Sequence, residues 1–453
     1  MDGKVQPRLL IGGTNSGCGK TTVSSALLRA LSRRGETLRA FKCGPDYIDP
    51  MFHTAVLGIP SRNLDLFFVD ERECRSQLAR TIPADGCGII EGVMGFYDGV
   101  SGTTDTASAA HLARATDTPA VLVVSPKGQS LTMAAALSGF VQFAPNTLKG
   151  VILNGISKGM YPFYKTIAEK SGLKVYGYLP RVPEAEIPDR HLGLVTASEI
   201  GDLQKKLDLL ADAAEECLDL DGLLALARSA PPLTETAAPC APVCDRPVRI
   251  AVARDAAFCF YYADNFDVLR ELGAELIEFS PLQDAHLPEQ IDGLYLGGGY
   301  PELYADRLSA NQTLRDELAA AIRGGLPTVA ECGGFMYLHE HMAAGKAEHA
   351  QSMVGIIPGT ARLTGKLQTF GYVTLTAQQD GLLCRAGEQI RAHEFHYAVS
   401  DDAGSAFRAE KPNGKTWSCV YMTDTMYAGY PHLYFRANRT FAENFVRRCA
   451  AMR

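Results

Sequence analysis

One glycine-rich segment of the 453-residue chain has residue types that bind phosphate. It reads Gly-Thr-Asn-Ser-Gly-Cys-Gly-Lys-Thr-Thr, residues 13–22, and it follows an apolar run and precedes a helical pattern. Glycines let backbone N–H groups converge on phosphate oxygens, a lysine adds a point charge, and a threonine hydroxyl suits Mg²⁺. We therefore expect ATP and Mg²⁺ to bind here. The candidate residues are Gly13, Asn15, Gly17, Gly19, Lys20, Thr21 and Thr22.

A second segment, residues 328–334, has the pattern of a nucleophile. It places Cys332 between a predicted strand and two glycines, which is typical of a sharp strand-to-helix turn that exposes a side chain. A helix N-terminus lowers the pKa of a thiol, so the pattern favours a thiolate. The upstream glycines Gly298 and Gly299 could direct N–H groups at an oxyanion. A base must accompany the thiol, and the candidates are His393, His396 and His432.

Acidic residues follow two further strand candidates. Asp46 and Asp49 come after the strand predicted at residues 38–44, while Glu91 and Asp98 lie in and after the one predicted at residues 88–94. The carboxyl ends of parallel strands meet at one edge of a sheet, so these acids should lie near the phosphate loop. A carboxylate on a buried strand beside such a loop usually holds Mg²⁺, directly or through water.

The elements that position these residues form two α/β regions. Before residue 227, short apolar runs alternate with helical stretches, which predicts a parallel sheet covered on both faces. These strand candidates are residues 8–14, 38–44, 88–94, 119–125, 150–156 and 174–180. Residues 227–247 are rich in Pro and Ala, and they read as a linker. After it the alternation resumes, with strand candidates at residues 248–254, 274–280, 292–299 and 327–334.

We therefore expect an α/β protein of two domains, residues 1–226 and 248–453, joined by residues 227–247. The net charge of −7 argues against nucleic-acid binding, which needs a basic face. No apolar run is long enough to span a membrane, and no signal-peptide pattern is present. The 12 scattered cysteines are typical of reduced thiols, so we expect a cytoplasmic protein.

The phosphate loop resembles that of dethiobiotin synthetase, because its first glycine is Gly13 and Thr14 stands where glycine is usual. Partitioning ATPases have a similar loop with a signature lysine where this chain has Asn15, and the mismatch argues against that class. Asn154 resembles the asparagine that reads adenine in dethiobiotin synthetase. This implies an N-terminal nucleotide-binding domain of that type.

Two segments resemble the cobyrinic acid a,c-diamide synthase family. They are residues 42–53, Lys-Cys-Gly-Pro-Asp-Tyr-Ile-Asp-Pro-Met-Phe-His, and residues 91–99, Glu-Gly-Val-Met-Gly-Phe-Tyr-Asp-Gly. The resemblance covers nearly the whole chain. It implies metal binding by Thr21, Asp46 and Glu91, and substrate binding by Asp46, Tyr47, Asp49 and Asp98. Arg190 and His191, in another segment similar to that family, could meet substrate carboxylates or form surface pairs.

The region around Cys332 resembles triad-type glutamine amidotransferases of flavodoxin-like fold. Their histidine lies near the C-terminus, which implies that Cys332 and His432 are catalytic and that Gly298 and Gly299 bind the glutamine. The usual His-x-Glu pattern is absent, because Tyr434 stands at its third position. The group that orients His432 is therefore open, as is the role of Glu394.

The resemblance implies a ligase that amidates the a- and c-carboxylates of cobyrinic acid with ammonia from glutamine. ATP would phosphorylate each carboxylate, and ammonia would pass between the sites shielded from water. Hydrogenobyrinic acid and nickel-sirohydrochlorin are alternative substrates, and a homodimer is compatible with the resemblance. From other classes, a partitioning-type ATPase switch and a stand-alone amidase remain as alternatives. The loop residue Asn15 opposes the first, and the intact Lys20, Thr21 and Glu91 oppose the second.

Overall fold

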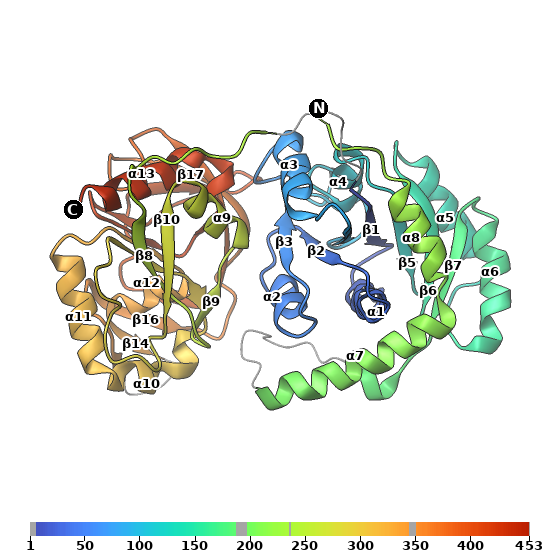
Figure 1. Cartoon of the computed structure of the whole chain (residues 1–453), viewed down its shortest axis with the longest axis horizontal. Helices are drawn as coiled ribbons and strands as arrows, with labels where there is room; N and C mark the ends of the chain where they lie inside the picture. Colours follow the sequence, from blue (N-terminus) through green and yellow to red (C-terminus); the bar gives the residue numbers. More distant parts are fainter. Residues whose placement is uncertain (1–5, 187–196, 235–236, 344–349, 453) are drawn as a thin grey trace. The chain divides into compact units, whose positions relative to one another are not determined.

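The computed structural model describes residues 6–186, 197–234, 237–343 and 350–452. The chain divides into two compact units, Met1–Ala238 and Pro239–Arg453 (Figure 1). The division falls inside residues 227–247, the segment rich in Pro and Ala. No helix in the described part of the chain is both long and apolar enough to cross a bilayer.

The first unit is built on a seven-stranded parallel sheet of order β3-β2-β4-β1-β5-β6-β7. Its strands are β1 (Arg8–Gly13), β2 (Leu38–Cys43), β3 (Ser61–Leu64), β4 (Cys87–Glu91), β5 (Ala120–Val124), β6 (Leu148–Asn154) and β7 (Lys174–Leu179). The predicted parallel sheet is confirmed. The edge strand β3 was not predicted, because its sequence Ser-Arg-Asn-Leu is short and largely polar.

Helices cover this sheet on both sides. They are α1 (Lys20–Arg33), α2 (Ile48–Ala55), α3 (Glu71–Thr81), α4 (Ala109–Ala115), α5 (Thr132–Gln142), α6 (Tyr161–Glu169), α7 (Ala197–Cys217) and α8 (Leu220–Arg228). Leu9 and Ile11 pack with α1, α7 and α8, while Leu10, which points to the opposite face, is also fully buried. In Figure 1, α7 (green) lies along α1 (blue), where Arg29 pairs with Asp208 at 2.8 Å.

The second unit has a six-stranded sheet of order β10-β8-β11-β13-β23-β22, parallel except for its last pair. Its strands are β8 (Val248–Ala253), β10 (Ala274–Phe279), β11 (Gly293–Leu296), β13 (Thr328–Glu331), β22 (Tyr421–Met422) and β23 (Met426–Gly429). The helices of the unit are α9 (Ala263–Glu271), α10 (Ala305–Ala310), α11 (Gln312–Arg323), α12 (Gly333–Tyr337) and α13 (Arg439–Ala450). One face of the sheet packs on α9 and α13, and the other packs on α10, α11 and α12.

Three smaller sheets complete the second unit, and the sequence did not predict most of their strands. A five-stranded antiparallel sheet contains β17 (Thr369–Ala377), β18 (Gln389–His396), β20 (Phe407–Glu410), β21 (Thr416–Cys419) and β24 (His432–Leu433). A four-stranded sheet contains β14 (His339–Ala343), β15 (Gln351–Ser352), β16 (Ile357–Leu363) and β19 (Ala398–Ser400). A two-stranded ribbon joins β9 (Phe258–Phe260) to β12 (Gly298–Gly299). Strands such as β17 and β20 alternate buried and more exposed residues, so they lack the continuous apolar runs of the parallel sheets.

Candidate functional site

The phosphate loop connects the end of β1 at Gly13 to the start of α1 at Lys20. Gly17 and Gly19 have φ values of 77° and 96°, in the left-handed region that favours glycine. A Cβ on Gly19 would lie 2.0 Å from Nδ2 of Asn154, and one on Gly13 would lie 2.5 Å from the Cys18 sulfur. The loop therefore has its shape only with glycine at these positions.

Lys20 lies beneath the loop and is largely buried, with 8% of its surface exposed. Its Nζ donates a hydrogen bond to the backbone oxygen of Asn15 at 3.3 Å. Burial lowers the pKa of Lys20 from its ordinary value, and the nearby Lys42 acts in the same direction. An anionic phosphate would offset both effects. Asn154, at the end of β6, donates to the backbone oxygen of Cys18 at 2.9 Å and thus adjoins the loop.

Glu91, the last residue of β4, is the centre of a buried polar cluster. Its Oε1 accepts hydrogen bonds from the Thr21 hydroxyl at 2.7 Å and from Lys42 Nζ at 2.8 Å. Lys42 also pairs with Asp49. Burial alone would lower the pKa of Lys42, but the charges of Glu91 and Asp49 raise it above its ordinary value, so the lysine stays charged. Burial raises the pKa of Glu91 in spite of this lysine.

Lys42 and His53 also lie at this site, although neither was predicted from the sequence. His53 is fully buried, its Nε2 lies 3.8 Å from Oε2 of Glu91, and burial lowers its pKa to about 4. Both side chains lie in the segment that carries the family resemblance. A charged residue on a strand has no sequence pattern that separates a site residue from a surface one.

The residues around Glu91 fit a Mg²⁺ ion bound with a nucleotide. Glu91 Oε2 is buried and has no hydrogen bond among the described residues, and the Thr21 hydroxyl lies beside the same carboxylate. In the described part of the chain, no group of three Asp, Glu, His or Cys side chains could hold a metal without other ligands. Phosphate oxygens and water would complete such a site.

Asp46 and its neighbours form the acidic loop before α2. Asp46 Oδ1 accepts from the backbone N–H of Ile48 at 2.9 Å, and Asn63 donates to the backbone oxygen of Asp46 at 2.7 Å. Burial and the nearby Asp49 raise the pKa of Asp46 to about 7. Tyr47, which precedes α2, is 8% exposed. Metal binding by Asp46 stays a prediction.

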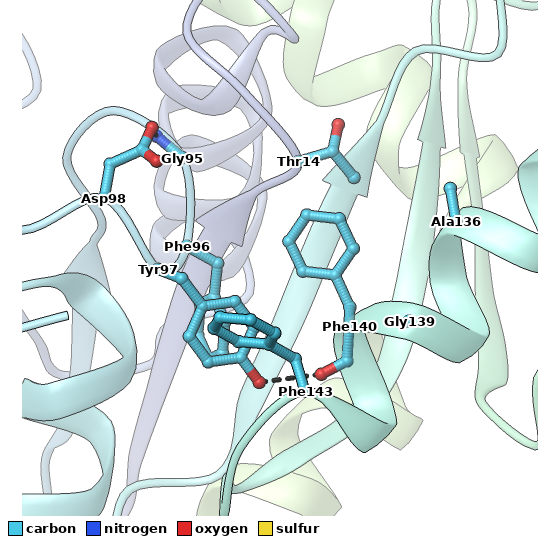
Figure 2. A pocket seen from close by; sticks show the side chains of 9 residues that line it. All are labelled: Thr14, Gly95, Phe96, Tyr97, Asp98, Ala136, Gly139, Phe140 and Phe143. Carbon is cyan, nitrogen blue, oxygen red and sulfur yellow. Dashed lines mark hydrogen bonds between the residues drawn. The ribbon is translucent and has the colours of Figure 1, made fainter. Parts of the chain in front are cut away.

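The loop after β4 brings Asp98 to the phosphate loop. The backbone N–H of Phe96 donates to the backbone oxygen of Gly13 at 2.8 Å, and Asp98 Oδ2 accepts from the N–H of Gly95 at 2.8 Å. Thr14 and Asp98 line one cavity of about 350 Å³ (Figure 2). The phosphate loop, Glu91 and Asp98 therefore share one edge of the sheet, as the strand order requires. Arg190 and His191 lie outside the described residues.

The nucleophile candidate of the second unit, Cys332, lies between β13 and α12. Its φ of 48° is unusual for a residue other than glycine, and its N–H donates to the backbone oxygen of Gly429 at 2.8 Å. A Cβ on Gly334 would lie 2.3 Å from the backbone oxygen of Leu296, so the turn needs that glycine. This is the geometry of a nucleophile elbow.

The expected thiolate is not found. Cys332 is only 7% exposed, and burial raises the pKa of its thiol above the ordinary value, as does the nearby Glu302. The helix α12, Gly333–Tyr337, has five residues and a correspondingly small dipole. The raised pKa favours the protonated thiol over the thiolate, so a nucleophilic Cys332 would need a base to accept its proton.

His432 is placed to be that base. It lies on β24 beside His393 of β18 and is 2% exposed. A Cβ on Gly298 would lie 2.4 Å from Cε1 and 3.2 Å from Nε2 of His432, so the imidazole edge faces the glycine loop. Burial, with the nearby His393, lowers the pKa of His432 to about 3, and a neutral imidazole can accept a proton.

The glycine loop adjoins the nucleophile turn. A Cβ on Gly333 would lie 3.1 Å from the backbone N of Gly299, and the N–H of Gly334 donates to the oxygen of Gly297 at 2.9 Å. Gly299 has a φ of 153°. These contacts place the loop where its N–H groups can reach an oxyanion at the thiol.

The other two histidine candidates lie on β18 of the five-stranded sheet, and polar partners are found for one of them. His396 Nδ1 is 2.7 Å from the oxygen of Ala398, its Nε2 is 3.3 Å from Oε2 of Glu394, and its ring stacks on Tyr430 at 3.9 Å. Burial lowers the pKa of His393 to about 3. The contacts therefore favour His432 as the base, with Glu394 acting on His396.

Glu331, the residue before the nucleophile, was missed by the sequence analysis. Its Oε2 lies 3.8 Å from Nδ1 of His432 and accepts from the Tyr295 hydroxyl at 3.1 Å. Its Oε1 accepts from the N–H of Leu433 at 2.9 Å. Burial raises the pKa of Glu331 to about 8. The triad pattern searches for the acid two residues after the histidine, so it could not find one on another strand.

Comparison with known proteins places both units. Residues 9–195 match the CobQ/CobB/MinD/ParA nucleotide binding domain, and residues 249–440 match the CobB/CobQ-like glutamine amidotransferase domain. A protein of Priestia megaterium named cobyrinate a,c-diamide synthase is 39% identical over 98% of this chain and 97% of its own length. Proteins of the same name from Clostridium acetobutylicum and a Synechococcus species are 40% and 41% identical. Each match covers 97% of this chain, with 99% and 98% of the respective relative.

Proposed function

This chain belongs to the family of the cobyrinate a,c-diamide synthases, and from this we propose that it amidates the a- and c-carboxylates of cobyrinic acid. The nitrogen comes from glutamine, and ATP activates each carboxylate. The observation that carries the proposal is the joint presence of two features, a phosphate loop bonded to Glu91 through Thr21 and a strained Cys332 whose turn adjoins the glycine loop that His432 faces. Neither half alone accounts for an amide ligase.

In the second unit, the thiol of Cys332 attacks the side-chain amide carbon of glutamine. His432 takes the thiol proton and gives it to the departing ammonia, leaving a glutamyl thioester that water cleaves to glutamate. N–H groups of the loop at Gly298 and Gly299 hold the oxyanion. Because the resting thiol is protonated, hydrolysis without the other substrates should be slow.

In the first unit, a substrate carboxylate oxygen attacks the γ-phosphorus of ATP, and ADP leaves. Ammonia then attacks the acyl phosphate, phosphate leaves, and an amide remains. The loop glycines, Asn15, Lys20 and Thr22 hold the phosphates, Asn154 contacts the adenine, and Thr21 and Glu91 hold Mg²⁺, which neutralises developing charge when bound. Asp46, Tyr47, Asp49 and Asp98 orient the carboxylate.

The test is to incubate the protein with Mg-ATP, amide-¹⁵N-glutamine and cobyrinic acid, and to follow the product by mass spectrometry. Two successive ATP-dependent incorporations of ¹⁵N are expected. Hydrogenobyrinic acid and nickel-sirohydrochlorin, run in parallel, decide among the tetrapyrroles. If the rate of ATP hydrolysis is the same with and without glutamine and each tetrapyrrole, the result would instead indicate a switch ATPase.

Cys332→Ala separates the two half-reactions. Glutamine-supported amidation should fall by at least about 10³-fold, because the nucleophile is lost. Amidation with ammonium should persist near the wild-type rate. Cys384→Ala, which removes another buried thiol of the same unit, is the matched control. An equal loss of amidation with glutamine and with ammonium would contradict the proposal that Cys332 acts only in glutamine hydrolysis.

A further inference from the structure

The cavity beside the phosphate loop has an aromatic wall that the proposed chemistry does not use. Figure 2 shows Tyr97, Phe140 and Phe143 grouped on one side of it. The Tyr97 hydroxyl donates to the backbone oxygen of Phe140 at 2.7 Å, and the two rings stack with centroids 5.8 Å apart. The ring of Phe143 lies 5.1 Å from that of Tyr97. These contacts hold the wall in a fixed geometry.

Three of the residues that line the cavity are exposed and lie in α5 or directly after it. Phe143 is 73% exposed, and Ala136 and Gly139 are small and also exposed. Large exposed apolar residues in one patch mark a binding surface more often than a bare surface. An occupant of this face must be largely hydrocarbon.

The position of the cavity decides which occupant it fits. Thr14 belongs to the phosphate loop and Asp98 to the loop that follows Glu91, and both line the cavity. A ligand held here therefore has one end beside the site of phosphoryl transfer. Among the described residues that line the cavity there is no lysine or arginine, so it does not suit a carboxylate.

We propose that this cavity and the adjoining residues of α5 hold part of the apolar face of the tetrapyrrole ring while one carboxylate arm reaches past Thr14 to the phosphate loop. A polycarboxylate macrocycle is wide and apolar within its polar rim, which matches an aromatic wall without cations. A volume of about 350 Å³ is at the small end for ligand pockets, so the cavity takes part of the ring and not the whole. This inference rests on the proposed function.

Two variants test it without disturbing the core. Gly139→Leu fills the cavity from an exposed position where a Cβ meets no atom within 4 Å, and Phe143→Ala removes the exposed end of the wall. Each should raise the KM for the tetrapyrrole by about tenfold or more. The KM for ATP and the glutamine hydrolysis of the second unit should be unchanged. Phe163→Ala, which removes another exposed phenylalanine of the first unit, is the matched control.

The outcomes separate the inference from the function it rests on. If the wild type amidates no tetrapyrrole, the proposed function fails. If it amidates one and both variants keep the wild-type KM, only the inference fails. If the variants instead lose self-association in sedimentation while their KM is unchanged, the face is a contact between copies of the chain, and the inference is likewise overturned.

A second inference concerns the group that orients His432, and it rests on different residues. The acid expected two residues after His432 is replaced by Tyr434. Glu331 lies on β13, is 2% exposed, and has Oε2 at 3.8 Å from Nδ1 of His432. Bonds from the N–H of Leu433 and the hydroxyl of Tyr295 fix both of its oxygens. The geometry points to Glu331 as the positioning residue for His432, supplied by the strand that carries the nucleophile.

Glu331→Gln keeps the shape and one acceptor oxygen but removes the carboxyl group that can take up and release a proton. We expect kcat for glutamine hydrolysis to fall by about 10- to 100-fold with KM nearly unchanged, and the pH profile of kcat/KM to change shape. Amidation with ammonium should be unaffected. Asp292→Asn, a buried carboxylate of the same unit that accepts from the N–H of Arg249, is the structural control. A wild-type kcat and pH profile in Glu331→Gln would overturn the assignment.

Discussion

At the scale of single residues, Lys42 has the most consequential position in the nucleotide-binding unit. It is 6% exposed and pairs with both Glu91 and Asp49. A buried ion pair contributes little relative to an apolar substitute for both partners, but removing one partner leaves an unpaired buried charge. The two buried carboxylates, Glu91 and Asp49, therefore share the positive charge of one lysine.

Lys42→Met should lower the free energy of unfolding of the first unit by about 3 kcal/mol, because it leaves two buried carboxylates without a cation. Denaturant titration at neutral pH measures this. Lys174→Met is the matched control, since Lys174 pairs with Asp219 at the surface, where the side chains are 54% and 44% exposed. That control should change stability by less than about 1 kcal/mol. Equal effects would mean that the Lys42 cluster is hydrated and not buried.

Glu331 gives a pH dependence whose sign can be worked out. Burial raises its pKa from 4.5 to about 8, so the folded protein binds its proton more tightly than the unfolded chain does. The stability that this group contributes is complete below pH 4.5 and falls as the pH rises toward 8. The glutamine side chain of the Glu331→Gln variant does not titrate in this pH range. The advantage of Glu331→Gln over the wild type should therefore grow by about 1.4 kcal/mol per pH unit across this window, in denaturant titrations at several pH values. A constant difference would contradict the burial of this carboxyl.

The residue scale also shows what a sequence pattern can find. The phosphate loop and Cys332 are found because their chemistry depends on neighbours in the chain, namely glycines that permit unusual φ values. Lys42, His53 and Glu331 are found only in the structure, because each of them meets a partner from an element distant in the chain. The thiolate expected at Cys332 was wrong, since the sequence contains the helix start but not the burial.

At the scale of elements, the phosphate loop connects β1 to α1. Gly19 has little room for a side chain, because a Cβ there would lie 2.0 Å from Nδ2 of Asn154. The same Nδ2 of Asn154, on β6, donates a hydrogen bond to the backbone oxygen of Cys18. The loop is thus shaped by a strand that is distant in sequence.

Gly19→Ala should lower the affinity for ATP by at least about tenfold. Its φ of 96° is strained for alanine, and the added Cβ would lie 2.0 Å from Asn154, so the loop must move. Binding of a fluorescent ATP analogue measures this. Gly159→Ala, where a Cβ meets nothing within 4 Å, should bind normally. Unchanged binding in Gly19→Ala would mean that the loop adapts freely.

Prediction of the elements from sequence was uneven for a physical reason. Most of the parallel strands are buried on both faces, so their apolar runs identify them, and the α/β fold class of both units is confirmed. The antiparallel strands of the second unit, such as β17, have one exposed face and alternate in polarity. β24, which carries His432, has only two residues, and no periodicity can be read from so short a strand.

At the scale of the whole molecule, each unit has its own apolar core. The core of the first unit draws on the strands of the seven-stranded sheet with α1, α7 and α8, and those of the second unit draw on its own sheets and helices. The proposed amide-forming and glutamine-hydrolysing activities therefore belong to units with separate apolar cores.

Thermal unfolding should accordingly show two transitions. ATP should raise the midpoint of one of them, with about 2.7 kcal/mol of added stability at an ATP concentration 100 times its Kd. Lys20→Ala, measured in parallel by calorimetry, should abolish that shift and leave the other transition in place. A single transition that ATP raises as a whole would show that the two units unfold together.

The burial of Lys20 beside the phosphate loop has a consequence for calorimetry. Burial lowers the pKa of Lys20 in the free protein, and a bound phosphate raises it again. At any pH between these two values, nucleotide binding takes up a proton from the buffer. The measured heat of binding then includes the ionisation enthalpy of that buffer, so titrations in Tris and in phosphate will differ by an amount that counts the protons transferred.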